Sequence, residues 1–229
     1  MANETFVEKY LDFSRVNPES MQQAAIDTLF MTIVAMIFVI IIGFLLGLLL
    51  YSLSRNSSPY AKVCYSILSV VSNIFRSIPY IVLIILLMDF SRKLVGTGIG
   101  AKAAIPSLIV SAAPFYARLV EIAFREVDSG VLEAADAMGA SRIQKIFKVL
   151  IPESTPALLS GVTLTTITMI GFTAMAGIIG GGGLGGLAYQ EGFSRNNNTV
   201  TLVATVLILV IVFIIQFVGD QLVKRSDKR

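Results

Sequence analysis

The sequence predicts an all-α, polytopic membrane protein with five transmembrane helices. Of its 229 residues, 55% are apolar and only 14% are charged, and the mean hydropathy is +0.79. A soluble domain carries about 25% charged residues. Five segments are also long and apolar enough to span a bilayer, which takes about 20 mostly apolar residues. The length of the chain fits one domain.

The five predicted spans differ in how clearly they stand out. The first and the fifth contain apolar runs without a charge, the second is interrupted at Pro79, the third carries two prolines, and the fourth is rich in Thr. In the first span, Gly43 and Gly47 form a G-x-x-x-G pair, a pattern typical of helices that pack closely in a membrane. The predicted ranges of the spans are 24–53, 63–88, 99–120, 156–179 and 200–218.

The two ends of the chain are predicted to lie outside these spans. Residues 1–22 form a tail that mixes charged and apolar residues, and residues 6–13 fit either a short amphipathic helix at the membrane interface or a frayed tail. We expect no secretory signal peptide, because the apolar run begins only after Asp27 and is long enough to remain as a helix. Residues 223–229 form a basic tail.

The distribution of Lys and Arg predicts the orientation of the chain in the membrane. Five spans place the two termini on opposite sides. With the C-terminus inside, 11 of the 18 Lys and Arg residues fall in cytoplasmic segments and six fall outside. Because cytoplasmic loops are enriched in Lys and Arg, we expect an N-out/C-in orientation. The long segment 121–155 then lies in the cytoplasm.

Within that segment, residues 128–152 are predicted to form two short helices. Asp128 begins the first, and Gly139 suits the left-handed conformation in which helices often end. Ser141 and Gln144 match a capping box at the start of the second helix. Apolar residues share one face of this second helix at helical spacing, namely Ile143, Ile146, Phe147 and Leu150.

Two prolines are expected to separate the second short helix from the fourth span. Pro152 and Pro156 would stop the short helix, and Thr155 would cap the start of the span. The whole segment is then either an amphipathic loop that lies on the membrane or a docking element whose compact helix fits a groove on a cytoplasmic partner.

The composition excludes several kinds of chemistry. There is no His and a single Cys, Cys64, so His-dependent triads, His-bearing metal sites and an internal disulfide are all excluded. No Lys follows a Gly cluster as a phosphate-binding P-loop requires. Gly180, Gly182 and Gly185 match G-x-G-x-x-G literally, but no strand precedes them. We expect no catalytic residue, metal site, cofactor or nucleic-acid partner.

Short motifs give the chain a family resemblance. Glu133-Ala134-Ala135 is followed after three residues by Gly139 and after eleven more by Ile151-Pro152. This spacing resembles the EAA loop of type I ABC importer permeases. Over roughly residues 20–225, further segments look like the methionine-uptake permeases of that family, namely 73–79, 95–100, 112–115, 180–185 and 215–220.

The resemblance implies a transport function that is divided among subunits. The chain would be the permease, a multi-pass protein of the bacterial plasma (inner) membrane, and it would form a homodimer around one path. Two ATPase subunits would dock at the EAA helices and hydrolyse ATP, so the chain itself would be no enzyme. A substrate-binding (lipo)protein would deliver the substrate from outside.

The resemblance also implies that the substrate is methionine, as the D or L form. Another small amino acid, cystine or a short peptide stays open as an alternative. A secondary transporter is a less favoured alternative, because we find no internal repeat, and Arg76 is the one charge within the clear span cores.

Candidate site residues fall in three groups. By the resemblance, coupling to the ATPase involves Glu133, Ala134, Ala135, Gly139, Ile151 and Pro152. The translocation path or gate is predicted from a helical stripe in the fourth span together with the intramembrane arginine, namely Thr165, Met169, Phe172, Met175 and Arg76. A flexible turn between the fourth and fifth spans, facing outside, is predicted from Gly180, Gly181, Gly182, Gly183, Gly185 and Gly186.

Overall fold

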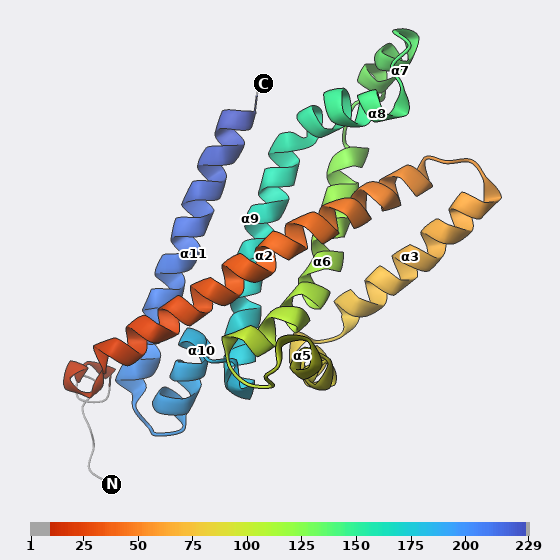
Figure 1. Ribbon diagram of the computed structural model, residues 1–229. Coiled ribbons are helices and arrows are strands. Elements are labelled where there is room, and N and C mark those ends of the chain that lie inside the picture. The colour runs from red at the N-terminus through yellow and green to blue at the C-terminus, as the bar shows by residue number, and fades with distance from the viewer. Residues whose placement is uncertain (1–9, 228–229) are drawn as a thin grey trace. The chain divides into compact units, whose positions relative to one another are not determined.

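The computed structural model describes residues 10–227, and every regular element within them is a helix (Figure 1). The first short element, η1 (Phe13–Arg15), is a single 3-10 turn. The predicted interfacial helix at 6–13 lies mostly outside the described residues, as does the end of the basic tail.

Within residues 10–227, four continuous helical stretches are long and apolar enough to cross a membrane: Pro18–Ser54, Ala101–Arg125, Arg142–Gly181 and Asn198–Ser226. The first, second and fourth are the helices α2, α6 and α11. A broken pair, α3 (Pro59–Ser77) and α4 (Tyr80–Leu86), makes a fifth span if the two helices are counted together. The predicted all-α, multi-span fold class is therefore confirmed.

The break between α3 and α4 has a local cause at Pro79. A proline disfavours the helical conformation of the residue before it, here Ile78. Pro79 itself is extended, with ψ of 133°, and its carbonyl accepts the first hydrogen bonds of α4, from Val82 N and Leu83 N. After α4 the chain continues as α5 (Met88–Val95).

The expectation that Pro152 and Pro156 end a helix is wrong. The chain is helical without interruption through α8 (Arg142–Lys145), the π-helical turn η2 (Ile146–Leu150) and α9 (Ile151–Ala176). A proline removes one donor and crowds a carbonyl one turn earlier. Here the wider turn η2 ends at Leu150, just before Pro152, and the hydroxyls of Ser154 and Thr155 donate to Leu150 O and Ile151 O. Thr155 Oγ1 donates to Ile151 O at 2.8 Å, so Thr155 is not a cap.

By its contacts, the chain divides into two compact units. The first unit contains Ile78–Ser111, Thr166–Ile215 and the chain up to Ile37. The second unit contains Phe38–Ser77, Ala112–Thr165 and the chain from Gln216. Each unit has its own buried residues. In the first, a cluster is formed by Met21, Ala24, Leu184, Val200 and Ala204.

In the first unit, the glycine-rich segment is not the flexible turn that we expected. It forms three short helical pieces, η3 (Gly177–Gly181), α10 (Gly183–Leu187) and η4 (Ala188–Phe193). A Cβ atom on Gly185 would lie within 3.0 Å of Ala174, and one on Gly177 would lie within 3.0 Å of the Gly186 backbone. The run of glycines therefore allows the helical pieces to touch through their backbones.

In the second unit, Gly43 and Gly47 lie against α6, as the G-x-x-x-G pair predicts. A Cβ atom on Gly47 would meet Ala117 O and Val120 Cβ at less than 3.0 Å. One turn further along α6, the fully buried Phe124 contacts the ring of Tyr51 edge-on, at a centroid distance of 5.6 Å. The absence of side chains on two successive turns of α2 thus sets how closely it packs on α6.

Candidate functional site

The segment that carries the Glu-Ala-Ala motif is a compact helical hairpin in the second unit. Its first helix, α7 (Ser129–Ala137), begins at Asp128, whose Oδ1 accepts a hydrogen bond of 2.6 Å from Gly130 N. Gly139 follows the helix with φ of +75°. Gly139 thus has the left-handed conformation that the sequence predicts, and it allows the chain to turn into α8.

The second arm of the hairpin is fixed by local hydrogen bonds. Ser141 Oγ accepts from Gln144 N at 3.3 Å, and Gln144 Oε1 accepts from Ser141 N at 2.8 Å, which confirms the predicted capping box. Lys145 Nζ pairs with Asp136 Oδ1 of α7 at 2.6 Å. Because this ion pair joins the two arms, α7 and α8 lie against each other at one end of the second unit (Figure 1).

Most of the hairpin surface is open to a partner. Glu133 and Ala134 are exposed, whereas Ala135 is buried. The predicted apolar face of the second arm is only partly covered, because Leu150 is buried but Ile143 and Phe147 are about two-thirds exposed. The remaining motif residues, Ile151 and Pro152, are half-buried and exposed, respectively.

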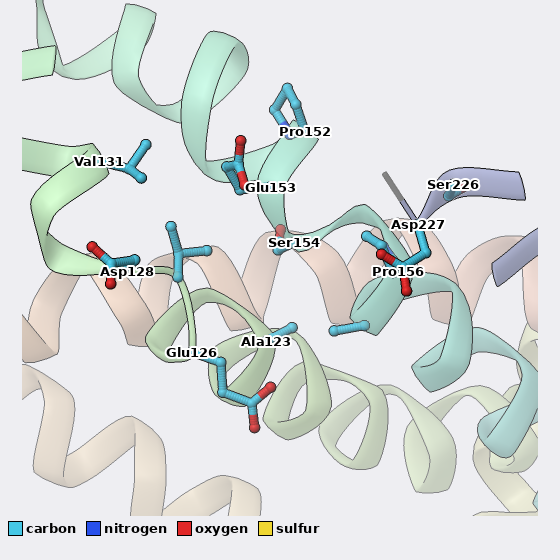
Figure 2. Close-up of a pocket in the computed structure, with 12 residues that line it drawn as sticks. Ala123, Glu126, Asp128, Val131, Pro152, Glu153, Ser154, Pro156, Ser226 and Asp227 are labelled. Carbon is cyan, nitrogen blue, oxygen red and sulfur yellow. The ribbon is translucent and has the colours of Figure 1, made fainter. Parts of the chain in front are cut away.

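The two ends of the hairpin segment meet around an acidic cavity of about 390 Å³ (Figure 2). Carboxylates on its walls come from the end of α6, the start of α7, the first turn of α9 and the end of α11. They belong to Glu126, Asp128, Glu153 and Asp227. Pro152 and Pro156 form an apolar part of the same wall. The hairpin is therefore attached to the rest of the unit beside a group of four carboxylates.

A buried carboxylate on α6 was not singled out as a site residue from the sequence. Glu121 is fully buried, and it pairs with Arg118 Nη1 at 2.7 Å and Arg125 Nη2 at 2.6 Å. Tyr65 of α3 donates a hydrogen bond of 3.0 Å to the same carboxylate. We call these four residues the Glu121 cluster. The signal in the sequence is the spacing of opposite charges at i,i+3 and i,i+4 on one helix.

Arg76 does not take part in that cluster. It lies exposed in the last turn of α3, with its guanidinium carbon 5.9 Å from the centroid of the Phe115 ring. Among the described residues, Arg76 forms no ion pair, with Glu121 or with any other acid. The contact with Phe115 is a cation–π interaction, and it offsets part of the unfavourable free energy of placing a charge near the membrane interior.

The predicted stripe on α9 divides into buried and accessible residues. Thr165 and Met169 are fully buried, and Thr165 Oγ1 donates to Gly161 O at 2.7 Å. Met175 is 43% exposed and Phe172 is half-buried. A side chain that is fully buried within the chain does not present a surface to a passing substrate, so Phe172 and Met175 remain as the path candidates.

Phe172 is held by an aromatic partner that sequence reasoning missed. In the first unit, its ring stacks on Tyr80 of α4, with centroids 4.8 Å apart and planes 16° from parallel. The buried Tyr80 hydroxyl lies 3.2 Å from Ser107 Oγ. Because Ser107 Oγ donates its single proton to Ala104 O at 2.8 Å, Tyr80 is the donor toward Ser107. Phe172 is thus backed by a ring whose orientation is fixed.

The glycine-rich segment lines a polar cavity of about 450 Å³ in the first unit. Gly182, Gly183 and Gly186 form part of its wall, and three carboxylates, those of Glu19, Asp27 and Glu191, form another part. Gly180 and Gly181 lie just outside this wall, where Gly180 O accepts from Gly100 N at 2.8 Å. Among the described residues, no group of three or more His, Cys, Asp or Glu is arranged to hold a metal ion.

Comparison with a protein-family model places this arrangement among known membrane proteins. Residues 43–229 match the family described as the inner membrane component of binding-protein-dependent transport systems. This match covers well over half of the chain.

Individual relatives and solved structures agree with the family match. The chain is 59% identical over 181 residues to the methionine import system permease protein MetP of Bacillus subtilis, covering 79% of this chain and 82% of the relative. It is 44% identical over 206 residues to the probable D-methionine transport system permease protein MetI of Pasteurella multocida, covering 90% and 95%. An inward-facing structure of the MetNI methionine ABC transporter matches with a TM-score of 0.87 at 43% identity, covering 92% and 98%.

Proposed function

Because the chain belongs to the family of inner membrane components of binding-protein-dependent transport systems, we propose that it is the permease subunit of an ATP-driven importer of methionine. The assignment of methionine as the substrate rests on the high sequence identity to relatives named for methionine import. The fold of the chain also matches a methionine transporter over nearly its whole length. The chain contributes the path through the membrane, and separate subunits contribute the energy.

The assembly that we propose is a homodimer of this chain with two ATPase subunits and an external substrate-binding protein. The chain has the N-out/C-in orientation, which the excess of Lys and Arg on the hairpin side supports. The hairpin of α7 and α8 then faces the cytoplasm. The glycine-lined cavity beside Glu19 and Asp27 faces outside, where the binding protein releases its substrate.

The hairpin is the element that couples the ATPase to the permease. Glu133 and Ala134 face outward, Gly139 sets the turn, and the ion pair between Asp136 and Lys145 makes the two arms move together. Closure of the ATPase subunits around ATP shifts the hairpin, and the connected helices change between inward-open and outward-open states. ATP and substrate act on this equilibrium only through their different affinities for the two states.

Phe172 and Met175 contact the substrate in the path. They lie three residues apart on α9 and are the accessible members of the predicted stripe. A thioether and an aromatic ring both interact favourably with the sulfur of a methionine side chain, and Met adapts its shape to its neighbours. Tyr80 acts as a positioning residue, because it holds the Phe172 ring from behind.

The proposal is tested by uptake of labelled methionine into vesicles that contain the chain with its ATPase and binding protein. We expect uptake that requires ATP inside and the binding protein outside, and that excess unlabelled methionine abolishes. Phe172→Ala or Met175→Ala should reduce uptake at a given rate of ATP hydrolysis. The matched control is Met169→Leu, a volume-conserving change at a fully buried site of the same helix.

Two results would contradict the proposal. If cystine or a short peptide competes for uptake and methionine does not, the substrate assignment is wrong. If reporters fused to the two ends of the chain lie on the same side of the membrane, the orientation with opposite termini is wrong. Uptake driven by an ion gradient in the absence of ATP would instead favour a secondary transporter.

A further inference from the structure

A basic cavity lies in the second unit beside the coupling hairpin, and it contains two arginines that have no role in the transport mechanism described above. It has a volume of about 540 Å³ and lies between the end of α2 and the hairpin. Its lining includes three cations. Arg55 comes from the residues that follow α2, whereas Arg142 and Lys145 come from α8. The fold therefore brings basic side chains from distant parts of the sequence to one cavity.

The charges on this cavity are only partly neutralised. Among the residues that the structure describes, Asp136 is the one acid in its lining, and it already pairs with Lys145 at 2.6 Å. Within residues 10–227, no ion pair is formed by Arg55 or Arg142. Two guanidinium groups thus remain for an anion, and a guanidinium matches the oxygens of a phosphate with two parallel hydrogen bonds.

The rest of the lining contains both polar and apolar residues. Hydroxyl and amide groups come from the end of α2 and the residues after it, namely Ser52, Asn56 and Ser57. The apolar residues are Tyr51, Leu132, Ile146 and Leu150. A free phosphate would use only the polar groups, whereas an amphiphile with a charged head and an acyl chain would use both kinds.

The position of the cavity in the sequence is that of a membrane interface. The uncharged run of α2 extends from Thr28 to Ser54, and Arg55 is the first charge that follows it. Lys and Arg collect directly beside the ends of membrane spans, where anionic lipid headgroups lie. We therefore expect Arg55 at the level of the headgroups in whichever leaflet it faces.

We propose that this cavity binds the phosphate of an anionic phospholipid, with Arg55 and Arg142 as its ligands and an acyl chain against the apolar residues of the lining. Basic pockets beside membrane helices are known to take such headgroups. The bound lipid would join the end of α2 to the base of the coupling hairpin. This proposal depends on the chain being a membrane protein and not on which substrate it carries.

The test is native mass spectrometry of the complete permease–ATPase complex after incubation with phosphatidylglycerol, phosphatidylcholine or inorganic phosphate. We expect phosphatidylglycerol to stay bound in preference to the other two. The double variant Arg55→Gln/Arg142→Gln should weaken its apparent binding by about tenfold or more, because both charged hydrogen-bond donors are lost. The matched control is Lys224→Gln/Arg225→Gln, which removes two exposed positive charges at the end of α11.

Each other outcome overturns the proposal. Equal loss of phosphatidylglycerol in the control variant would mean general attraction to basic surface charge. Equal retention of inorganic phosphate would mean a simple anion site. If the complex binds no phosphatidylglycerol and Arg55→Gln/Arg142→Gln instead releases the ATPase subunits, the cavity is occupied by a carboxylate of that partner protein. Melting curves of both double variants verify that each complex is folded.

Discussion

The Glu121 cluster allows a quantitative prediction about stability. In the variant Glu121→Gln the side chain keeps its shape and one carbonyl oxygen but loses its charge. The NH₂ group of the new amide must then face a donor from either Arg118 or Arg125. Both arginines would retain their positive charge next to a buried group that no longer balances it.

The size of the effect follows from the geometry. Three hydrogen bonds of 2.6, 2.7 and 3.0 Å converge on the fully buried carboxylate. A hydrogen bond to a charged group contributes about 1.5–3 kcal/mol, and breaking a buried ion pair costs about 3–5 kcal/mol. Because Arg118 and Arg125 are 40% and 45% exposed, water replaces part of the loss. We therefore expect the free energy of unfolding to fall by about 2–3 kcal/mol.

Thermal unfolding of the purified complex in lipid nanodiscs measures this loss. For a chain of this size, a change of 1 kcal/mol lowers the melting temperature by about 2–4 °C, so we expect a decrease of roughly 4–12 °C. The control is Glu126→Gln, the same substitution at an exposed position directly after the same helix. A Glu121→Gln complex that melts within 1 °C of the control would refute the reasoning.

A double-mutant cycle identifies the contribution of Tyr65 to the same cluster. The hydroxyl of Tyr65 donates to Glu121 and accepts from Arg125 Nη2, both at 3.0 Å. Tyr65→Phe should destabilise the wild-type protein by about 1 kcal/mol and should have less effect when Glu121→Gln is already present. Additive effects of the two changes would show that the hydroxyl acts independently of the carboxylate.

Three further predictions concern other features of the fold. Gly185→Ala should destabilise the protein by at least about 1–3 kcal/mol, because the backbone at Ala174 must move to admit the new Cβ atom. Gly171→Ala, where a Cβ atom meets nothing within 4 Å, should leave the melting temperature unchanged or raise it. Gly139→Leu places a side chain at φ of +75° and should uncouple ATP hydrolysis from uptake without changing substrate affinity; normal uptake would argue against the hairpin as coupling element. Tyr80→Phe removes the hydrogen bond to Ser107 but keeps the stack, so it should cost about 1 kcal/mol in stability while the KM for uptake stays within about twofold.

Much of the fold could be predicted because its signals are local. The apolar runs indicated the helices, the spacing of Gly43 and Gly47 indicated a close contact on α2, and Ser141 with Gln144 indicated a helix start. In each case the residues that give the signal lie within one or two turns of each other, even where the partner, as for Gly43 and Gly47, is the distant helix α6. The same reason explains why the turn at Gly139 was predicted correctly.

The features that escaped prediction depend on residues distant in sequence or on a choice between local rules. Tyr65 meets Glu121 from another helix, and Tyr80 stacks on Phe172 across a long stretch of chain. The periodicity of α9 indicated a stripe but did not reveal that protein rather than a path covers Met169. At Pro156 the local rule predicted a helix start, whereas the proline lies inside α9 and the helix runs through it.

The backbone contact around α10 has a consequence for how substitutions in this protein should be read. Similarity scales treat Gly→Ala as one of the mildest changes. At Gly177 and Gly185, however, neighbouring backbone atoms occupy the space that a Cβ atom would need, so even the methyl group of Ala is too large. Gly171, a few residues away, has free space at the same atom. A saturation mutagenesis map of 171–186 should therefore show isolated positions that accept no substitution beside a position that accepts many, and residue type alone would not distinguish them.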